Sequence, residues 1–180
     1  MYKFFVILIS GVLILLPVAQ LQAESCYALW HKRNLIFAQK GYCFSSSLGK
    51  QVFANYSCRT KNIRLTADEK LTVKQNIATE KKLRCNIPTN AGKTVLAIAN
   101  QKYSFVFEDV SIEGIGRDSQ GRWWIQAWTS PNNVGLDPAQ SRESEQWFVI
   151  FNGSKWTLHG YGTGLGRSDC PSDIIWEAIF

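Results

Sequence analysis

Thiols and imidazoles are the side chains in this sequence with the most chemistry to offer. The chain has five cysteines and two histidines, namely Cys26, Cys43, Cys58, Cys85, Cys170, His31 and His159. No Cys-x-x-Cys pair occurs and nitrogen ligands are few, so we predict no metal site. Cys170 and His159, with Asp169 beside the thiol, could form a nucleophile and its base. Nothing in the spacing requires this pair, so we predict no catalytic residue and no cofactor.

The start of the chain indicates which compartment these thiols meet. An apolar run over residues 4–19 follows Lys3 and precedes Leu21-Gln22-Ala23. This is the pattern of a secretory signal peptide, with cleavage expected after Ala23. A retained membrane anchor is the less favoured alternative because the run is short for a span. We therefore predict a periplasmic or secreted protein, in which cysteines are disulfide candidates.

Charge and composition divide the remaining chain into two halves. Residues 24–86 hold 12 Lys or Arg against 4 Asp or Glu, whereas residues 87–180 hold 7 against 10. Four of the five cysteines lie in the first half and six of the seven tryptophans in the second. We predict a signal peptide over residues 1–23 and two modules, residues 24–88 and 93–180, with a joint at Pro88–Gly92.

The first module is predicted to be helical. Apolar spacing favours one helix over residues 27–40 that ends at Gly41, and a short one through residues 52–53 that begins at Ser45–Ser47. A capping box at Thr66 and Glu69 opens a third helix over residues 67–83. That helix is expected to bury a thin stripe of Leu71, Ile77 and Leu83.

Disulfides should brace this module, because about 60 residues bury too little apolar surface to be robust alone. Four cysteines allow three pairings, and the sequence does not decide among them. We favour Cys43 with Cys58, which brackets the short helix, and Cys26 with Cys85, which ties the module's start to its end. Cys170 then remains free or contacts the first module.

The second module is predicted to form strands. Short apolar or alternating runs occur at residues 95–99, 103–107, 110–112, 122–128, 146–151, 155–158 and 174–179. Asn152-Gly153 between two of them predicts a type I′ hairpin. The whole is an α+β protein, whose second module is an antiparallel meander, curved sheet or open barrel.

One group of residues in the second module could bind a small ligand. In a regular strand Trp124 and Trp128 share one face, where an exposed pair could stack on sugar rings or a peptide, with Arg122 supplying polar contacts. Core packing is the favoured interpretation for these rings, because a small sheet domain needs large core residues. The glycines of residues 160–166 fit no nucleotide-binding spacing and indicate a loop.

The basic first half could attract an anionic partner. Lys81, Lys82 and Arg84 form a basic run at the end of the third helix. Export argues against nucleic acid, so the expected partner is an anionic envelope polymer or, through peripheral contact, a membrane surface. A solvated lysine-rich face is the alternative.

Residues 33–44, from Arg33-Asn34 to Phe44, resemble the core of the YARHG domain. The family is named for the string Tyr-Ala-Arg-His-Gly, which reads Phe37-Ala38-Gln39-Lys40-Gly41 here. Ala38 and Gly41 match, and Phe37 is a conservative replacement. Phe53 and the helix start at residues 65–69 continue the pattern. Gln39 and Lys40 depart from it, so no role is carried to them.

The resemblance implies an extracytoplasmic bacterial domain, found beside peptidases and in lipoproteins, without assigned catalytic residues. The cysteines suggest a disulfide-bearing branch followed by a domain of unknown function. Arg33 and Asn34 either bond loop carbonyls or, for Arg33, grip an anionic ligand. We predict an exported, non-enzymatic binding or accessory protein that engages a cell-envelope component or another exported protein. The alternative is an envelope hydrolase, or its regulator, that uses Cys170 and His159.

Overall fold

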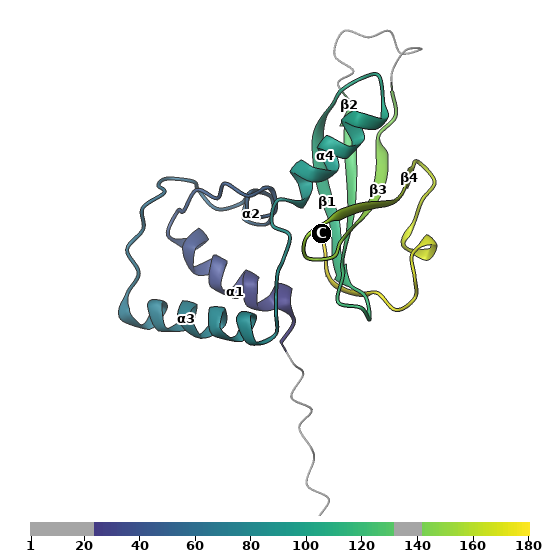
Figure 1. The fold of residues 1–180 in the computed structure, drawn as a ribbon. Helices are drawn as coiled ribbons and strands as arrows, with labels where there is room; N and C mark the ends of the chain where they lie inside the picture. Colours follow the sequence, from purple (N-terminus) through teal and green to yellow (C-terminus); the bar gives the residue numbers. More distant parts are fainter. Residues whose placement is uncertain (1–23, 132–141) are drawn as a thin grey trace, which may run out of the picture.

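The computed structural model describes residues 24–131 and 142–180, and the predicted signal peptide with its cleavage after Ala23 lies outside these ranges. In the described chain, four α-helices precede five strands that form an open antiparallel sheet (Figure 1). This arrangement confirms the predicted α+β class. No helix within the described ranges is both long and apolar enough to cross a bilayer.

Helix α1 (Cys26–Gln39) ends at a left-handed glycine, as its sequence predicts. Gly41 has a φ of +77°, and its amide donates to the carbonyl of Ala38 at 2.8 Å. The amide of Tyr42 donates to the carbonyl of Phe37 at 3.1 Å, and the two rings meet edge-on with centroids 5.8 Å apart. These contacts make a Schellman motif with its usual apolar contact. The string at residues 37–41 is therefore the last turn and the stop of α1.

The next two helices begin at the predicted caps. The hydroxyl of Ser46 accepts from the amide of Gly49 at the start of α2 (Ser47–Val52). Helix α3 (Ala67–Lys82) opens with the capping box, in which Thr66 and Glu69 exchange hydrogen bonds of 2.7 and 3.3 Å. The polar caps Ser46 and Thr66, rather than the spacing of apolar residues, mark where these two helices begin.

The predicted buried stripe of α3 is wrong. Leu71, Ile77 and Leu83 are 54, 49 and 40% exposed, whereas Asn76 and Glu80 are buried. The residues that face α1 are largely polar, and two of them pair with basic residues of α1. A hydrophobic stripe is therefore not what packs this helix, which explains why apolar periodicity misplaced its inner face.

Helix α4 (Ala91–Lys102) replaces the first predicted strand of the second module. Val95 and Ala99 do form an apolar set, but they recur with Ala91 at four-residue intervals and all three are fully buried. That spacing gives one face of a helix. The predicted joint at residues 88–92 falls at the start of this helix, which packs on the sheet.

The sheet has the strand order β4-β3-β2-β1-β5. Its strands are β1 (Phe107–Arg117), β2 (Trp123–Pro131), β3 (Glu145–Phe151), β4 (Trp156–Gly162) and β5 (Ile175–Ile179). All four neighbouring pairs are antiparallel. Of the predicted runs, residues 103–107 lead into one long strand, β1, and residues 110–112 lie within it; the register of β1 shifts twice against β2.

The hairpin at Asn152-Gly153 is present, but its turn is not type I′. Phe151 pairs with Trp156, so the loop has four residues rather than two. Gly153 has a φ of +96°, whereas Asn152 is not among the residues with positive φ. Its side-chain oxygen instead accepts from the amides of Ser154 and Lys155 at 3.1 and 2.8 Å. This side chain stabilises the longer turn.

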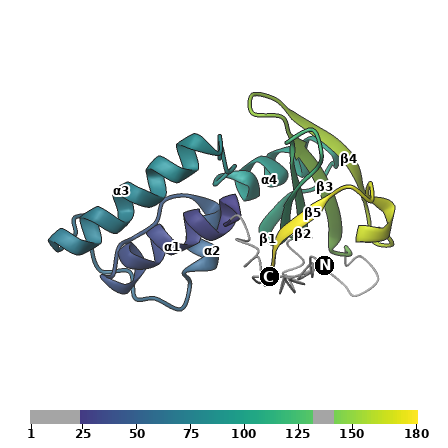
Figure 2. The ribbon, with the colours of Figure 1, turned by 90° about the horizontal axis from the view of Figure 1, so that it is seen from below.

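One face of the sheet carries the main core. Trp123, Ile125 and Ala127 of β2 pack there with Val95 and Ala99 of α4, and the same cluster extends to Trp30 and Leu48 of the helical half. Figure 2 shows α4 lying between the other helices and the sheet. The two halves therefore share one hydrophobic core.

Candidate functional site

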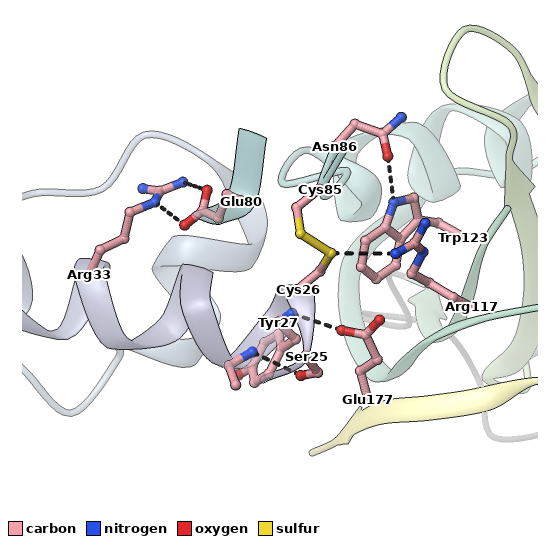
Figure 3. Close-up of a disulfide and its surroundings, with 11 residues drawn as sticks. Ser25, Cys26, Tyr27, Arg33, Glu80, Cys85, Asn86, Arg117, Trp123 and Glu177 are labelled. Atoms are coloured by element: carbon pink, nitrogen blue, oxygen red, sulfur yellow. Dashed lines mark hydrogen bonds and ion pairs between the residues drawn. A yellow bond between two sulfur atoms is a disulfide. The ribbon is translucent and has the colours of Figure 1, made fainter. Parts of the chain in front are cut away.

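A disulfide and two ion pairs hold α1 against α3. Cys26 is bonded to Cys85 just beyond the end of α3, which is the pairing we favoured (Figure 3). The guanidinium of Arg33 meets Glu80 through two hydrogen bonds of 2.6 and 3.1 Å. Lys40 lies 3.0 Å from Glu69 at the opposite end of α3. Arg33 of α1 and Lys40 at its C-cap are thus fixed by carboxylates of α3.

The same disulfide lies at the junction with the sheet. A guanidinium nitrogen of Arg117 in β1 lies 3.4 Å from the sulfur of Cys26, and this guanidinium also lies over the ring of Trp123 (Figure 3). The indole of Trp123 donates to the side-chain oxygen of Asn86 at 2.9 Å. Glu177 of β5 accepts from the amide of Tyr27 at 2.8 Å. The sheet therefore supplies a cap for the first turn of α1.

The second disulfide, Cys43–Cys58, fixes the loop between α2 and α3 against the end of α1. The carbonyl of Gly41 accepts from the amides of Arg59 and Thr60 at 2.8 and 3.1 Å, and the amide of Cys43 donates to Thr60 at 2.9 Å. A Cβ on Gly41 would lie 3.1 Å from a carbonyl oxygen of this loop. Glycine is thus needed here both for its φ and for the close approach.

An aromatic groove of about 590 Å³ opens on one side of that loop. We define it by Phe37 of α1, by Tyr42 and Phe44 after α1, and by Lys61 and Asn62 of the loop. Trp30 underlies it and is almost wholly buried. The rings of Tyr42 and Phe44 meet edge-on at 5.1 Å. Half-buried rings beside amide and cationic groups are the composition of a ligand site.

A second hollow, of about 660 Å³, opens on the other side of the loop. We call it the basic hollow, because Lys40, Arg59 and Arg64 line it together with the amide of Asn55. Asn62 and Ile63 line both hollows. The loop is therefore a shared wall, with Phe37, Tyr42 and Phe44 in the aromatic groove and Lys40, Arg59 and Arg64 in the basic hollow.

The structure brings Arg33 and Asn34 to the aromatic groove but gives both a partner within the protein. Arg33 pairs with Glu80 instead of the loop carbonyls that we expected. Asn34 is buried and donates to the carbonyl of Trp30 at 2.8 Å. Both residues line the groove, where their fixed positions shape it.

The two tryptophans predicted as a binding site on the sheet do not form an exposed pair. Trp124 and Trp128 share a face, but Trp124 is 1% exposed and lies against the ring of His159, at 4.7 Å between centroids. Arg122 and the indole of Trp124 instead both donate to the carboxylate of Asp118, at 2.6 and 2.9 Å. Burial would raise the pKa of Asp118, but these bonds outweigh it and hold the pKa below its usual value.

The thiol of Cys170 lacks the environment of a nucleophile. Burial and the charge of Asp169 raise its pKa to about 11, so the thiol stays protonated near neutral pH. His159 faces the carbonyl of Asp169 at 3.5 Å and packs on Trp124. Among the described residues, no cluster of three or more His, Cys, Asp or Glu side chains could hold a metal ion.

Sequence reasoning missed the loop residues that complete the two hollows. Lys61 and Asn62 carry no motif, and Arg59 and Arg64 were counted only as part of a basic half. The available signal was the favoured Cys43–Cys58 bridge, which predicts that residues just after Cys58 return to the end of α1. Tyr42 and Phe44 lie in the segment that resembles the YARHG domain, but the groove that they line is completed by Lys61 and Asn62, which come later in the chain.

A comparison with known families separates the first three helices from the rest of the chain. The YARHG domain matches residues 12–81, which include the string at residues 37–41 and most of α3. Neither a curated protein nor a solved structure matches the chain. The match ends before Cys85, α4 and the sheet. Residues 12–81 are therefore similar to the YARHG domain, and a separate β region without a family match follows.

Proposed function

We propose that this protein is an exported, non-enzymatic binding protein that holds a component of the bacterial cell envelope. The observation that carries the proposal is the aromatic groove. Its rings at Phe37, Tyr42 and Phe44 come from the segment that matches the YARHG domain, a domain associated with extracellular binding.

Two further features support this proposal. The Cys26–Cys85 and Cys43–Cys58 bridges suit an oxidising compartment outside the cytosol. The groove is also built on fixed backbone, since a Schellman motif ends α1 and a disulfide fixes the opposite wall. A site that is rigid before binding loses less conformational entropy on association.

Retention of the oxidised chain on isolated envelope fractions tests the proposal. The wild-type chain should sediment with one fraction, and a Lys61→Ala/Asn62→Ala variant should lose at least about tenfold in affinity, because it removes two polar groups from the groove. Lys93→Ala, on the exposed side of α4, is the matched control and should bind as the wild type does. Equal retention of the groove variant and the control, or retention on no fraction, would contradict the proposed function.

A further inference from the structure

The cations around the shared wall differ in whether a carboxylate neutralises them. Lys40 pairs with Glu69, and Arg33 pairs with Glu80. Arg59, Lys61 and Arg64 make no ion pair with any described residue. No Asp or Glu lines either hollow. This wall therefore presents three uncompensated positive charges to whatever lies along it.

The cations are also attached to backbone that is already ordered. Arg59 directly follows Cys58 of the disulfide, and its amide is bonded to Gly41. The hydroxyl of Thr60 accepts from the amide of Asn62 at 3.0 Å, which fixes the turn that carries Lys61. Three like charges held on a short segment repel one another, and a bound anion relieves that repulsion.

We propose that the aromatic groove and the basic hollow are two subsites for one polysaccharide chain that bears carboxylate groups. This inference rests on the proposed function and names the chemistry of its ligand. A sugar ring packs against the half-buried rings of Tyr42 and Phe44, and Asn62 at the shared wall meets its hydroxyl groups. A carboxylate on the next part of the chain enters the basic hollow, where Arg59 and Arg64 pair with it.

The lining of the two hollows explains why the proposed ligand needs both negative charge and sugar rings. A simple polyanion would satisfy the cations but leave the rings of the groove without a stacking partner. A neutral polysaccharide would contact the rings but leave three cations unpaired. Because Asn62 and Ile63 belong to both hollows, one extended chain can occupy both at once, so the two contributions reinforce each other.

Binding to polygalacturonate, with its fully methyl-esterified form as the neutral polymer of the same backbone, tests this inference. The oxidised wild-type chain should bind the acid form at least about tenfold more tightly than the ester in low salt, and the difference should shrink as salt is raised. An Arg59→Gln/Arg64→Gln variant should lose most of this preference. Lys81→Gln/Lys82→Gln removes the same charge from the exposed side of α3 and should leave the preference within about twofold of the wild type.

Three outcomes overturn the inference. Equal affinity for acid and ester would remove the role of the anion, and equal affinity for inorganic polyphosphate would remove the role of the sugar. An equal loss in the two double variants would show a net-charge effect only. The single variant Lys61→Gln, checked like the others by its thermal midpoint, repeats the test if the first variant folds poorly. Retention on envelope fractions without any preference for the acid polymer would leave the proposed function standing and refute this ligand class.

Discussion

Replacing Gly41 by alanine tests the account of the segment at residues 37–41. An alanine at a φ of +77° costs about 1–2 kcal/mol relative to its preferred conformations. Its Cβ would also lie 3.1 Å from the carbonyl oxygen of Ser57 and 3.2 Å from two side-chain carbons of Arg59. The lower entropy of the unfolded alanine chain returns about 0.4–1 kcal/mol. The close contacts add about 1 kcal/mol, at the low end of overpacking costs because the Arg59 side chain can shift. We therefore expect a net loss of about 2 kcal/mol in the free energy of unfolding.

Urea and thermal unfolding of the oxidised chain measure this loss. For a chain of this size, about 2 kcal/mol corresponds to a fall of roughly 6 °C in Tm. Gly164→Ala is the matched control, because a Cβ there meets nothing within 4 Å and the backbone is outside the left-handed region. The control should be neutral or slightly stabilising. If both variants shift the midpoint equally, the proposed need for glycine at the end of α1 is wrong.

Three further predictions concern the junction, the free thiol and a buried carboxylate. The Cys26→Ala/Cys85→Ala variant should lose about 4 kcal/mol in the free energy of unfolding measured in urea, because the bridge that it removes closes a segment with a sequence separation of 59. A loss below about 1 kcal/mol would contradict this. Alkylation of Cys170 should follow a pKa near 11 in the native chain and near 8.5 after unfolding, and identical pH profiles would refute its burial. The lowered pKa of Asp118 stabilises the fold above the usual aspartate pKa, near 3.9, and this contribution is lost as the pH falls through the lowered value. Asp118→Asn should therefore flatten the fall of Tm as the pH drops below about 4, and an unchanged slope would contradict the assignment.

The end of α3 has the same turn as the end of α1, but without a glycine. Arg84 is the non-glycine residue with positive φ in the described chain, at +54°, and the amide of Cys85 donates to the carbonyl of Glu80 at 2.8 Å. This is the same Schellman arrangement with arginine in the glycine position. The strained turn directs Cys85 back toward Cys26, so the disulfide at the junction helps to maintain a conformation that arginine disfavours.

Local signals in the sequence predicted local structure well. Ser46, Thr66 with Glu69, and Gly41 mark helix ends through hydrogen bonds within a few residues, so they could be read without knowing the fold. Val95 to Ala99 was misread because five apolar residues are too few to separate the two periods. The flanking Ala91, which reveals the helical spacing, had been assigned to the joint.

Features that depend on distant partners could not be predicted. The inner face of α3 is polar because Arg33 and Lys40 of another helix neutralise its carboxylates, and no pattern within α3 shows this. Trp124 and Trp128 were correctly placed on one face, but only the position of His159 reveals that Trp124 is covered. The two hollows likewise need residues 59–64 to fold back onto the end of α1.

The bond from Tyr27 to Glu177 ties the first helix to the last strand, and the rings of Tyr27 and Phe180 also meet at 5.8 Å. The two residues are 150 positions apart in the sequence, so the first turn of α1 is completed by a strand from a distant part of the chain. Without that strand one amide of the opening turn has no protein acceptor, and the junction beside Cys26 is incomplete. The helical part therefore depends on the folded sheet for the final form of its first turn, whatever local structure it gains alone.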